Sequence, residues 1–513
     1  MQPQKETYPI IDIFAGPGGL GEGFSSASGK TNKPLFHSLA SIERDEHSHN
    51  TLLLRHFFRS FPNENAPEEY YLYMKGDITK KELFDKYPKQ YEKATKSALR
   101  ISLGAESHDI VKNLIQQRLV NEKWALIGGP PCQAYSLVGR SRMKGSSDFD
   151  KDERHFLYQE YLKIIVDHRP PVFVMENVKG MLSAKVNGEP LIGKIISDLS
   201  KPKQALENNE NGLSYNLYSL SKPVTSNETV DPRIFLVKAE EYGVPQARHR
   251  MFILGIRNDI RVKPNLLIRH SPPTVKEVIG NLPKIRSGLS RETDSPTRWR
   301  EIIENFINTD LAKEMSNSDD ASKVRQELQK LLKGKFPENR FITKYPGPIK
   351  GSHPVLKSYF DPHLRALSSH ESKAHMPSDI HRYLFAALFG QAIDKSPKMS
   401  DFPVSLLPAH KNVDLARIGK MFSDRFRVQL SDRVSTTITS HIAKDGHYFI
   451  HYDPAQCRSF TVREAARLQT FPDNYKFEGP RTAQYHQVGN AVPPYLAKQI
   501  AEIVYDILER MDS

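Results

Sequence analysis

The chain has 513 residues, of which 38% are hydrophobic and 26% are charged, and its formal net charge is +13. This length predicts two or three domains, and the apolar content excludes a wholly disordered chain. A membrane-spanning helix needs about 18 consecutive apolar residues, and no apolar run in the sequence is that long. No secretory signal is visible at the start, and the two cysteines, Cys132 and Cys457, are too few for a disulfide framework. We therefore expect a reducing compartment and, from the basic excess, a polyanionic partner.

Alternating strands and helices are predicted over the first 260 residues. Short apolar runs predict strands at 8–14, 35–43, 71–78, 124–129, 171–177, 234–239 and 250–257. Residues 155–168 show helical spacing of apolar side chains, and Pro170 ends that pattern. Such alternation is typical of an α/β fold with a mostly parallel, doubly wound sheet, which gathers its ligands at the carboxyl ends of the strands.

The rest of the chain divides by composition. Residues 80–123 form a polar insertion that we expect to be helical, within a first domain that spans residues 1–258. Proline-containing loops and short helical patterns predict a second domain over 259–430. Residues 431–513 are expected to complete both domains. An apolar helix at 495–511 within this segment is expected to pack on the first domain.

A glycine-rich turn follows the first predicted strand. Gly16, Gly18 and Gly21 match the pattern GxGxxG, which allows close approach of a ligand to a helix N-terminus. Glu43 and Asp77 end the next two predicted strands, where they can accept hydrogen bonds from a ribose and an adenine amine. A tight structural turn is the simpler interpretation, and a dinucleotide and S-adenosylmethionine fit the turn equally well.

A cysteine loop follows the strand at 124–129. In GGPPCQAYSLVGRSR (128–142), Cys132 comes directly after two prolines at the ligand edge of the predicted sheet. A lone cysteine is usually a small buried residue, but the polar flanks here favour a reactive thiol. Glu176 ends the next strand in ENV, and QARHR (246–250) supplies Arg248 and Arg250 to the same edge.

Together these segments resemble the DNA cytosine-5 methyltransferases over nearly the whole chain. The resemblance is carried, in the family's order, by DIFAGPGGLGEGF, GDIT, GGPPCQAYS, MENVKG, QARHRMFILGIR, RVSTTIT, FTVREAARLQTFPDNY and QVGNAVP. It implies a Rossmann-like methyltransferase sheet with helices on both faces. It also implies that the middle region is an inserted target-recognition domain.

The resemblance implies a catalytic role for four residues. Cys132 would add to ring carbon 6 of cytosine, because carbon 5 becomes nucleophilic only after that addition. Glu176 would bind ring nitrogen 3 and the exocyclic amine, and Arg250 with Arg248 would hold the base carbonyl or a flanking phosphate. The target carbon lies inside the base stack, so the cytosine must be flipped out of the duplex.

The resemblance also implies the cofactor, S-adenosyl-L-methionine, with S-adenosyl-L-homocysteine as product. Phe14 would pack on the adenine, Glu43 would bind the ribose, Asp77 the adenine amine, and Asn490 the amino-acid end. The remaining residues implied to line the cofactor site are Gly16, Gly18, Gly19, Pro130 and Leu157. One position departs from the family, since Arg44 stands where an aromatic residue is frequent.

The middle region is expected to contact DNA through phosphate-binding cations and a few base-reading side chains. Within it, the apolar pattern at 375–390 indicates packing rather than base readout. His370, His375 and His381 lack the Cys or Asp spacing of a metal site, so we expect no metal. Cys457 has no comparable setting and is expected to be inert.

Three other functions are compatible with parts of this sequence. A transfer-RNA cytosine-5 methyltransferase shares the core, but its Cys-Phe-Thr element is missing, since Cys457 is followed by Arg-Ser. A nucleotide-dependent oxidoreductase leaves PPCQ, ENV and QxRxR unexplained, and a decayed, non-catalytic protein would have lost Cys132 or Glu176. We therefore expect a sequence-specific DNA methyltransferase of the compact prokaryotic or phage type in a restriction-modification system. It would act as a monomer on double-stranded DNA, associated with the nucleoid in the cytoplasm, away from membranes and apart from its cognate endonuclease.

Overall fold

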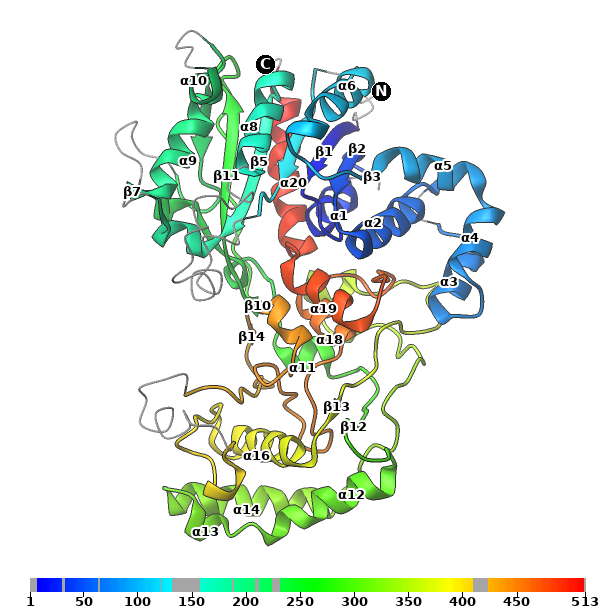
Figure 1. The fold of residues 1–513 in the computed structure, drawn as a ribbon, viewed down its shortest axis with the longest axis vertical. Coiled ribbons are helices and arrows are strands. Elements are labelled where there is room, and N and C mark those ends of the chain that lie inside the picture. The colour runs from blue at the N-terminus through cyan, green and yellow to red at the C-terminus, as the bar shows by residue number, and fades with distance from the viewer. Residues whose placement is uncertain are drawn as a thin grey trace. The chain divides into compact units, whose positions relative to one another are not determined.

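The structure is a computed structural model, and it describes residues 7–29, 33–62, 65–120, 122–131, 157–186, 189–207, 212–223, 231–408 and 423–511. The chain forms two compact units, each built from separate stretches of sequence (Figure 1). The first unit comprises Met1–Pro67, Lys80–Ser271 and Ala491–Ser513. The second comprises Glu68–Thr79 and Pro272–Asn490. In the described part of the chain, no helix is both long and apolar enough to cross a membrane.

An eight-stranded sheet forms the centre of the first unit, in the order β3-β2-β1-β4-β5-β11-β8, with β9 beside β11. The pairs from β3 to β5 are parallel, as predicted, whereas β11 is antiparallel to β5, β8 and β9. The strands are β1 Tyr8–Ile13, β2 Phe36–Glu43, β3 Ala98–Arg100, β4 Ala125–Gly128, β5 Val172–Val178, β8 Tyr215–Tyr218, β9 Leu236–Lys238 and β11 His249–Arg257. Every residue of β1 is buried, as expected of a central strand covered on both faces.

Helices cover both faces of this sheet, which confirms the predicted architecture. One face packs with α1 and α20, and the other with α6, α8 and α9. The helices of this unit are α1 Gly19–Ser26, α2 Glu46–Arg59, α4 Lys80–Lys86, α5 Pro88–Ser97, α6 His108–Arg118, α8 Leu157–His168, α9 Leu191–Ser200, α10 Pro202–Glu207 and α20 Pro494–Glu509. The predicted C-terminal helix therefore does pack on the first unit, where α20 lies beside α1 (Figure 1).

The strand predicted at 71–78 is wrong. This segment is helix α3, Glu68–Lys75, which belongs to the second unit. Its buried residues, Tyr70, Tyr71, Tyr73 and Met74, recur at helical spacing, and Gly76 ends the helix at a φ of 94°. The aromatic residues that suggested a strand instead face the second unit, where the Tyr71 hydroxyl donates to Asp361 Oδ2 at 2.8 Å.

The insertion at 80–123 is helical, as predicted, in α4, α5 and α6. It also contains β3, which pairs in parallel with β2. Four further strands have two residues each: β6 Lys185–Val186, β7 Glu189–Pro190, β10 Gln246–Ala247 and β14 Ser435–Thr436.

The second unit is mainly helical and packs around α16, Pro377–Ile393. Residues 380 and 383–390 of this helix are buried, which confirms that the apolar pattern at 375–390 serves packing. Its other helices are α11 Val275–Ile279, α12 Pro296–Asn305, α13 Leu311–Glu314, α14 Ser318–Leu332, α15 Pro354–Ser358, α18 Val462–Leu468 and α19 Arg481–Asn490. Two short parallel strands, β12 Gly288–Leu289 and β13 Ala374–His375, join its outer segments.

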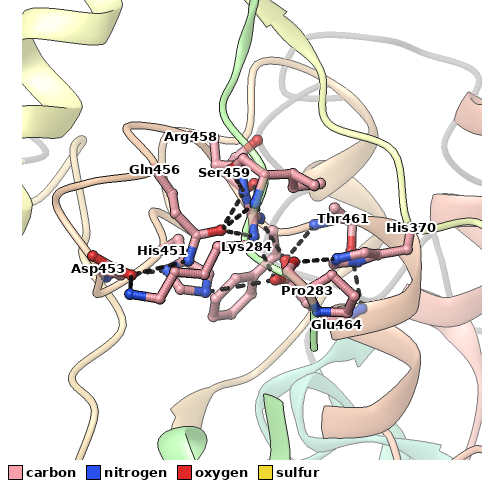
Figure 2. A network of polar contacts seen from close by, with 12 residues as sticks. Pro283, Lys284, His370, His451, Asp453, Gln456, Arg458, Ser459, Thr461 and Glu464 are labelled. Atoms are coloured by element: carbon pink, nitrogen blue, oxygen red, sulfur yellow. Dashed lines mark hydrogen bonds and ion pairs between the residues drawn. The ribbon is translucent and has the colours of Figure 1, made fainter. Parts of the chain in front are cut away.

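A buried polar network fixes the start of α18 in the second unit (Figure 2). Thr461 and Glu464 form a capping box, and Arg458 binds both carboxylate oxygens of Glu464 at 2.7 Å. His370 Nε2 donates to the carbonyl oxygen of Pro283 at 2.9 Å, so its Nδ1 is the acceptor for the Thr461 hydroxyl at 3.2 Å. Burial lowers the pKa of His370 to about 4, which keeps the ring neutral in this network.

Candidate active site

The glycine turn between β1 and α1 is held in a left-handed conformation. Phe14, Gly16 and Gly18 have φ angles of 58°, 58° and 92°. Gly18 caps α1, and a Cβ on Gly19 would lie 2.4 Å from the carbonyl oxygen of Val492, so a side chain at position 19 would collide with the backbone before α20. Half-buried Phe14 packs against the core beneath the sheet edge. The turn therefore presents backbone N–H groups at the N-terminus of α1, which suits an anionic or polar ligand.

Glu43 ends β2 with its carboxylate fixed by two backbone amides. The N–H of Gly16 donates to Oε2 at 2.8 Å, and the N–H of Asp45 donates to Oε1 at 2.7 Å. The structure thus joins two sequence-predicted residues, Gly16 and Glu43, in one contact. A carboxylate oriented in this way retains lone pairs for ribose hydroxyls, which is the chemistry expected of an adenosine-binding residue.

Asp12 is a residue of this site that the sequence analysis missed. It is 1% exposed beneath the turn, and burial, followed by the charge of Glu43, raises its pKa well above the ordinary value. A Cβ on Gly21 would lie 2.9 Å from Asp12 Oδ2, which explains why the third glycine of the motif is needed. The available signal was an acid in the middle of the apolar run YPIIDIF.

Two predicted cofactor residues lie in the second unit. Asp77 follows α3, and its side chain forms an ion pair with Lys75 at 2.6 Å. Asn490 is the last residue of α19. Leu157 belongs to the first unit, where it is the first residue of α8 and is half-buried.

The strand ends around the cysteine loop are tightly fitted. Cys132 itself lies outside the described residues, which resume the chain at Leu157 after Pro131. Buried Asn177 donates from Nδ2 to the carbonyl oxygen of Pro130 at 3.0 Å and so ties the end of β5 to the segment that leads to Cys132. Asn177 stands in the segment ENV, but no role was predicted for it, because its neighbour Glu176 carried the expected chemistry.

Glu176 and Arg250 form a direct pair at this sheet edge. Arg250 Nε lies 3.0 Å from Glu176 Oε1, and the two side chains are 15% and 12% exposed. The antiparallel pairing of β5 and β11 places Arg250 opposite Val178, two residues from Glu176 on the same face. A Cβ on Gly129 would lie 2.9 Å from Glu176 Oε2, so the end of β4 closes the other side of the carboxyl group.

Burial shifts the protonation equilibrium of Glu176 toward the neutral form. Burial raises its pKa above the ordinary value, and the positive charges of Arg250 and Arg248 oppose this increase without cancelling it. Arg248 is fully buried, and burial, reinforced by the charge of Arg250 and opposed by that of Glu176, lowers the pKa of its guanidinium well below the ordinary value. In its protonated form, a carboxyl group can donate a hydrogen bond to a ring nitrogen and accept one from an amine.

Comparison with known proteins decides the family. Residues 81–505 match the model of the C-5 cytosine-specific DNA methylases. A Type II methyltransferase of Bacillus paralicheniformis, M.Bpa9945I, is 32% identical over 522 residues, which cover 97% of this chain and 99% of that protein. The chain belongs to the C-5 cytosine-specific DNA methylase family.

Other relatives agree with this assignment of the methylase. M.DdeI of Desulfomicrobium norvegicum, also a Type II methyltransferase, is 27% identical, and the match covers 96% of this chain and 87% of that protein. A solved structure of a putative DNA modification methyltransferase encoded within a prophage, from E. coli, matches with a TM-score of 0.51 at 18% identity, over 98% of this chain and 100% of that chain. That likeness supports the fold of the methylase.

The histidines and the second cysteine considered in the sequence pack inside the second unit of the methylase. His381 Nε2 donates to the carbonyl oxygen of Ile302 at 2.6 Å, and the ring of His375 packs edge-on against Tyr383. Cys457 is buried in the core of the second unit, and burial raises the pKa of its thiol well above the ordinary value. A buried, protonated thiol is a poor nucleophile, in keeping with the expectation that Cys457 is inert.

Proposed function

We propose that this methylase is the modification enzyme of a Type II restriction-modification system, methylating carbon 5 of one cytosine in a specific DNA sequence. The observation that carries the proposal is the buried Glu176–Arg250 pair at the sheet edge, next to the segment Pro130–Pro131 that leads to Cys132. The printed names of the relatives, Type II methyltransferases, supply the biological setting. Its partner is double-stranded DNA, and it acts as a monomer on the nucleoid in the cytoplasm, apart from any cognate endonuclease.

The reaction is assigned to residues at this edge. The Cys132 thiolate adds to carbon 6 of the flipped cytosine, and the resulting electron density is directed to carbon 5. The Glu176 carboxyl group, whose pKa is raised by burial, donates its proton toward ring nitrogen 3 and accepts a hydrogen bond from the exocyclic amine. After methylation, loss of the carbon-5 proton restores the double bond and expels Cys132 as the thiolate.

Arg250, Arg248 and Asn177 are assigned to positioning and binding rather than to proton transfer. Arg250 holds the Glu176 carboxyl group in place through Nε, and the rest of its guanidinium, with Arg248, binds the base carbonyl or a flanking phosphate. Asn177 orients the start of the cysteine loop through the Pro130 carbonyl. Because the carboxyl group is fixed before the base arrives, little reorganisation is needed during the addition.

S-adenosyl-L-methionine is the proposed methyl donor. It would supply a methyl group bound to a positively charged sulfur, which leaves readily as the neutral thioether of S-adenosyl-L-homocysteine. The residues of the first unit fit it: the glycine turn offers backbone N–H groups, and the oriented Glu43 carboxylate suits the ribose. Phe14, Gly18, Gly19, Pro130 and Leu157 complete the proposed lining from this unit. Asp77 and Asn490 are assigned to the adenine amine and the amino-acid end.

Target recognition is assigned to residues 259–430, and residues 431–513 are proposed to complete both this region and the catalytic core. Lysine and arginine side chains of the recognition region would contact phosphates and so give salt-dependent binding. A smaller number of its side chains would read base edges and set the sequence specificity.

A duplex that carries 5-fluorocytosine tests the proposal directly. Fluorine at carbon 5 blocks the final elimination, so a covalent enzyme–DNA adduct should accumulate only when S-adenosylmethionine is present. Cys132→Ser should form no adduct but still bind DNA. An adduct on transfer RNA, with none on any duplex, would instead assign the enzyme to the transfer-RNA methyltransferases. Bisulfite sequencing of a host that expresses the gene would then identify the methylated sequence.

A further inference from the structure

Lys373 is a buried cation whose ammonium group is bound by carbonyls and an aromatic ring. Its side chain lies just before β13 and is 8% exposed. It donates hydrogen bonds to the carbonyl oxygens of Ile442 and Lys444, the latter at 3.0 Å, and lies 4.3 Å from the centre of the Tyr485 ring. Within the described part of the chain, no carboxylate forms an ion pair with it.

These contacts join two segments that meet at the end of α19. The carbonyls belong to the short helix Ser440–Ala443 and the residue that ends it, and Tyr485 lies in the middle of α19. One turn further along α19, a Cβ on Gly489 would lie 2.3 Å from the backbone nitrogen of Ser440. The last turn of α19 therefore rests directly on the start of Ser440–Ala443, and Asn490 follows immediately.

Simple packing does not account for a lysine at this position. Burial of an ammonium without a paired carboxylate is unfavourable, and a methionine would fill similar space without a charge to desolvate. Burial, reinforced by the charge of Arg481 and opposed by the more distant charge of Asp445, lowers the pKa of Lys373 to about 8. The charge does complement two carbonyls at the C-terminal end of Ser440–Ala443 and the face of the Tyr485 ring, partners that an apolar side chain cannot bind.

We propose that Lys373 is a positioning residue for cofactor binding, because one ammonium group holds Ser440–Ala443 and α19 together and thereby fixes Asn490. This inference rests on the proposed function, in which Asn490 contacts the amino-acid end of S-adenosylmethionine. Lys373 touches neither substrate nor cofactor and acts only through the placement of α19. Its loss should therefore weaken cofactor binding far more than it slows the chemical step.

Lys373→Met tests this role, with Lys373→Arg as the conservative variant and Lys89→Met, an exposed lysine of α5 outside the recognition region, as the matched control. We expect Lys373→Met to raise the KM for S-adenosylmethionine and the Kd for S-adenosylhomocysteine, measured by calorimetry, about tenfold, while kcat changes less than about threefold. Lys373→Arg should recover most of the affinity, since it restores a charge and donors. Lys89→Met should match the wild type in both constants.

A double-mutant cycle with Asn490→Ala separates positioning from general destabilisation. If Lys373 acts through Asn490, the two losses of affinity for S-adenosylhomocysteine will not add, and Lys373→Met will cost little in the Asn490→Ala background. Fully additive losses, or an unchanged Kd in Lys373→Met, would overturn the proposal. Lys373→Gln is subjected to the same cycle if the methionine variant does not fold. A wild-type protein that neither methylates DNA nor binds S-adenosylhomocysteine would instead count against the proposed function itself.

Discussion

Replacing Glu176 by glutamine removes its ionisable carboxyl group while keeping the size of the side chain. In the structure, Arg250 Nε donates to Glu176 Oε1 at 3.0 Å, and the amide oxygen of glutamine can accept the same hydrogen bond. The buried guanidinium then lies beside a neutral amide that cannot ionise, so the free energy of unfolding should fall by about 1–3 kcal/mol. The protein should therefore remain folded at 25 °C.

Catalysis should be affected much more strongly. A glutamine cannot give a proton to ring nitrogen 3 as the thiolate adds, and the loss of such a proton donor typically slows a reaction by about 10²–10⁴-fold. That range corresponds to about 3–5 kcal/mol of transition-state stabilisation. The Kd for S-adenosylhomocysteine should change less than about threefold, because Glu43 and the glycine turn lie on other strands.

The assay is single-turnover transfer of a tritiated methyl group to duplex DNA, with calorimetry for the product cofactor. Glu301→Gln, an exposed glutamate paired with Arg298, is the matched control and should behave as the wild type. A loss of kcat smaller than about tenfold would refute the assigned role of Glu176. Equal losses in the chemical step and in cofactor affinity would refute it as well, because they would indicate a general distortion of the sheet edge.

Three further predictions concern packing and pH. Gly129→Ala places a Cβ 2.9 Å from Glu176 Oε2 and should lower kcat about 10–100-fold in the same assay through displacement of the carboxyl group. Gly489→Ala overpacks the contact with Ser440 and should lower the free energy of unfolding by about 1–3 kcal/mol, seen as a lower Tm. The pKa of His370 is about 4 when folded and 6.5 otherwise, so the unfolded chain takes up the proton first as the pH falls below 6.5. Denaturant titrations should show about 2 kcal/mol of stability lost from this group between pH 7.5 and pH 5, and His370→Gln should remove that part of the pH dependence.

The sequence predicted the strands that contain long apolar runs, because burial on both faces requires such runs. The strands β1, β2, β4, β5 and β11 were all placed correctly. Residues 71–78 were misread because their aromatic side chains suit a strand and a helix equally, and contacts with the second unit decide between the two. The antiparallel direction of β11 was not apparent, since apolar content does not encode strand direction.

Only the part of the candidate site that lies at strand ends could be predicted from the sequence. Glu176 and Arg250 could be assigned to one sheet edge because both stand where strands begin or end, and the structure joins them directly. Asp12, Asn177 and Lys373 could not be found, because their importance depends on burial and on backbone partners far away in the sequence. Periodicity reports which face a residue occupies but not which carbonyl lies opposite it.

The place of α20 in the first core sets the order in which the chain can fold on the ribosome. Leu496, Ile500, Val504 and Leu508 pack in the core that also contains Leu20 and Phe24 near the N-terminus. At about 5–20 residues per second, α1 waits on the order of half a minute to a minute and a half for these partners to be synthesised. A chain cut short by a premature stop codon before α20 would leave that apolar face uncovered, which makes truncated products targets for chaperones and proteases rather than sources of partial activity.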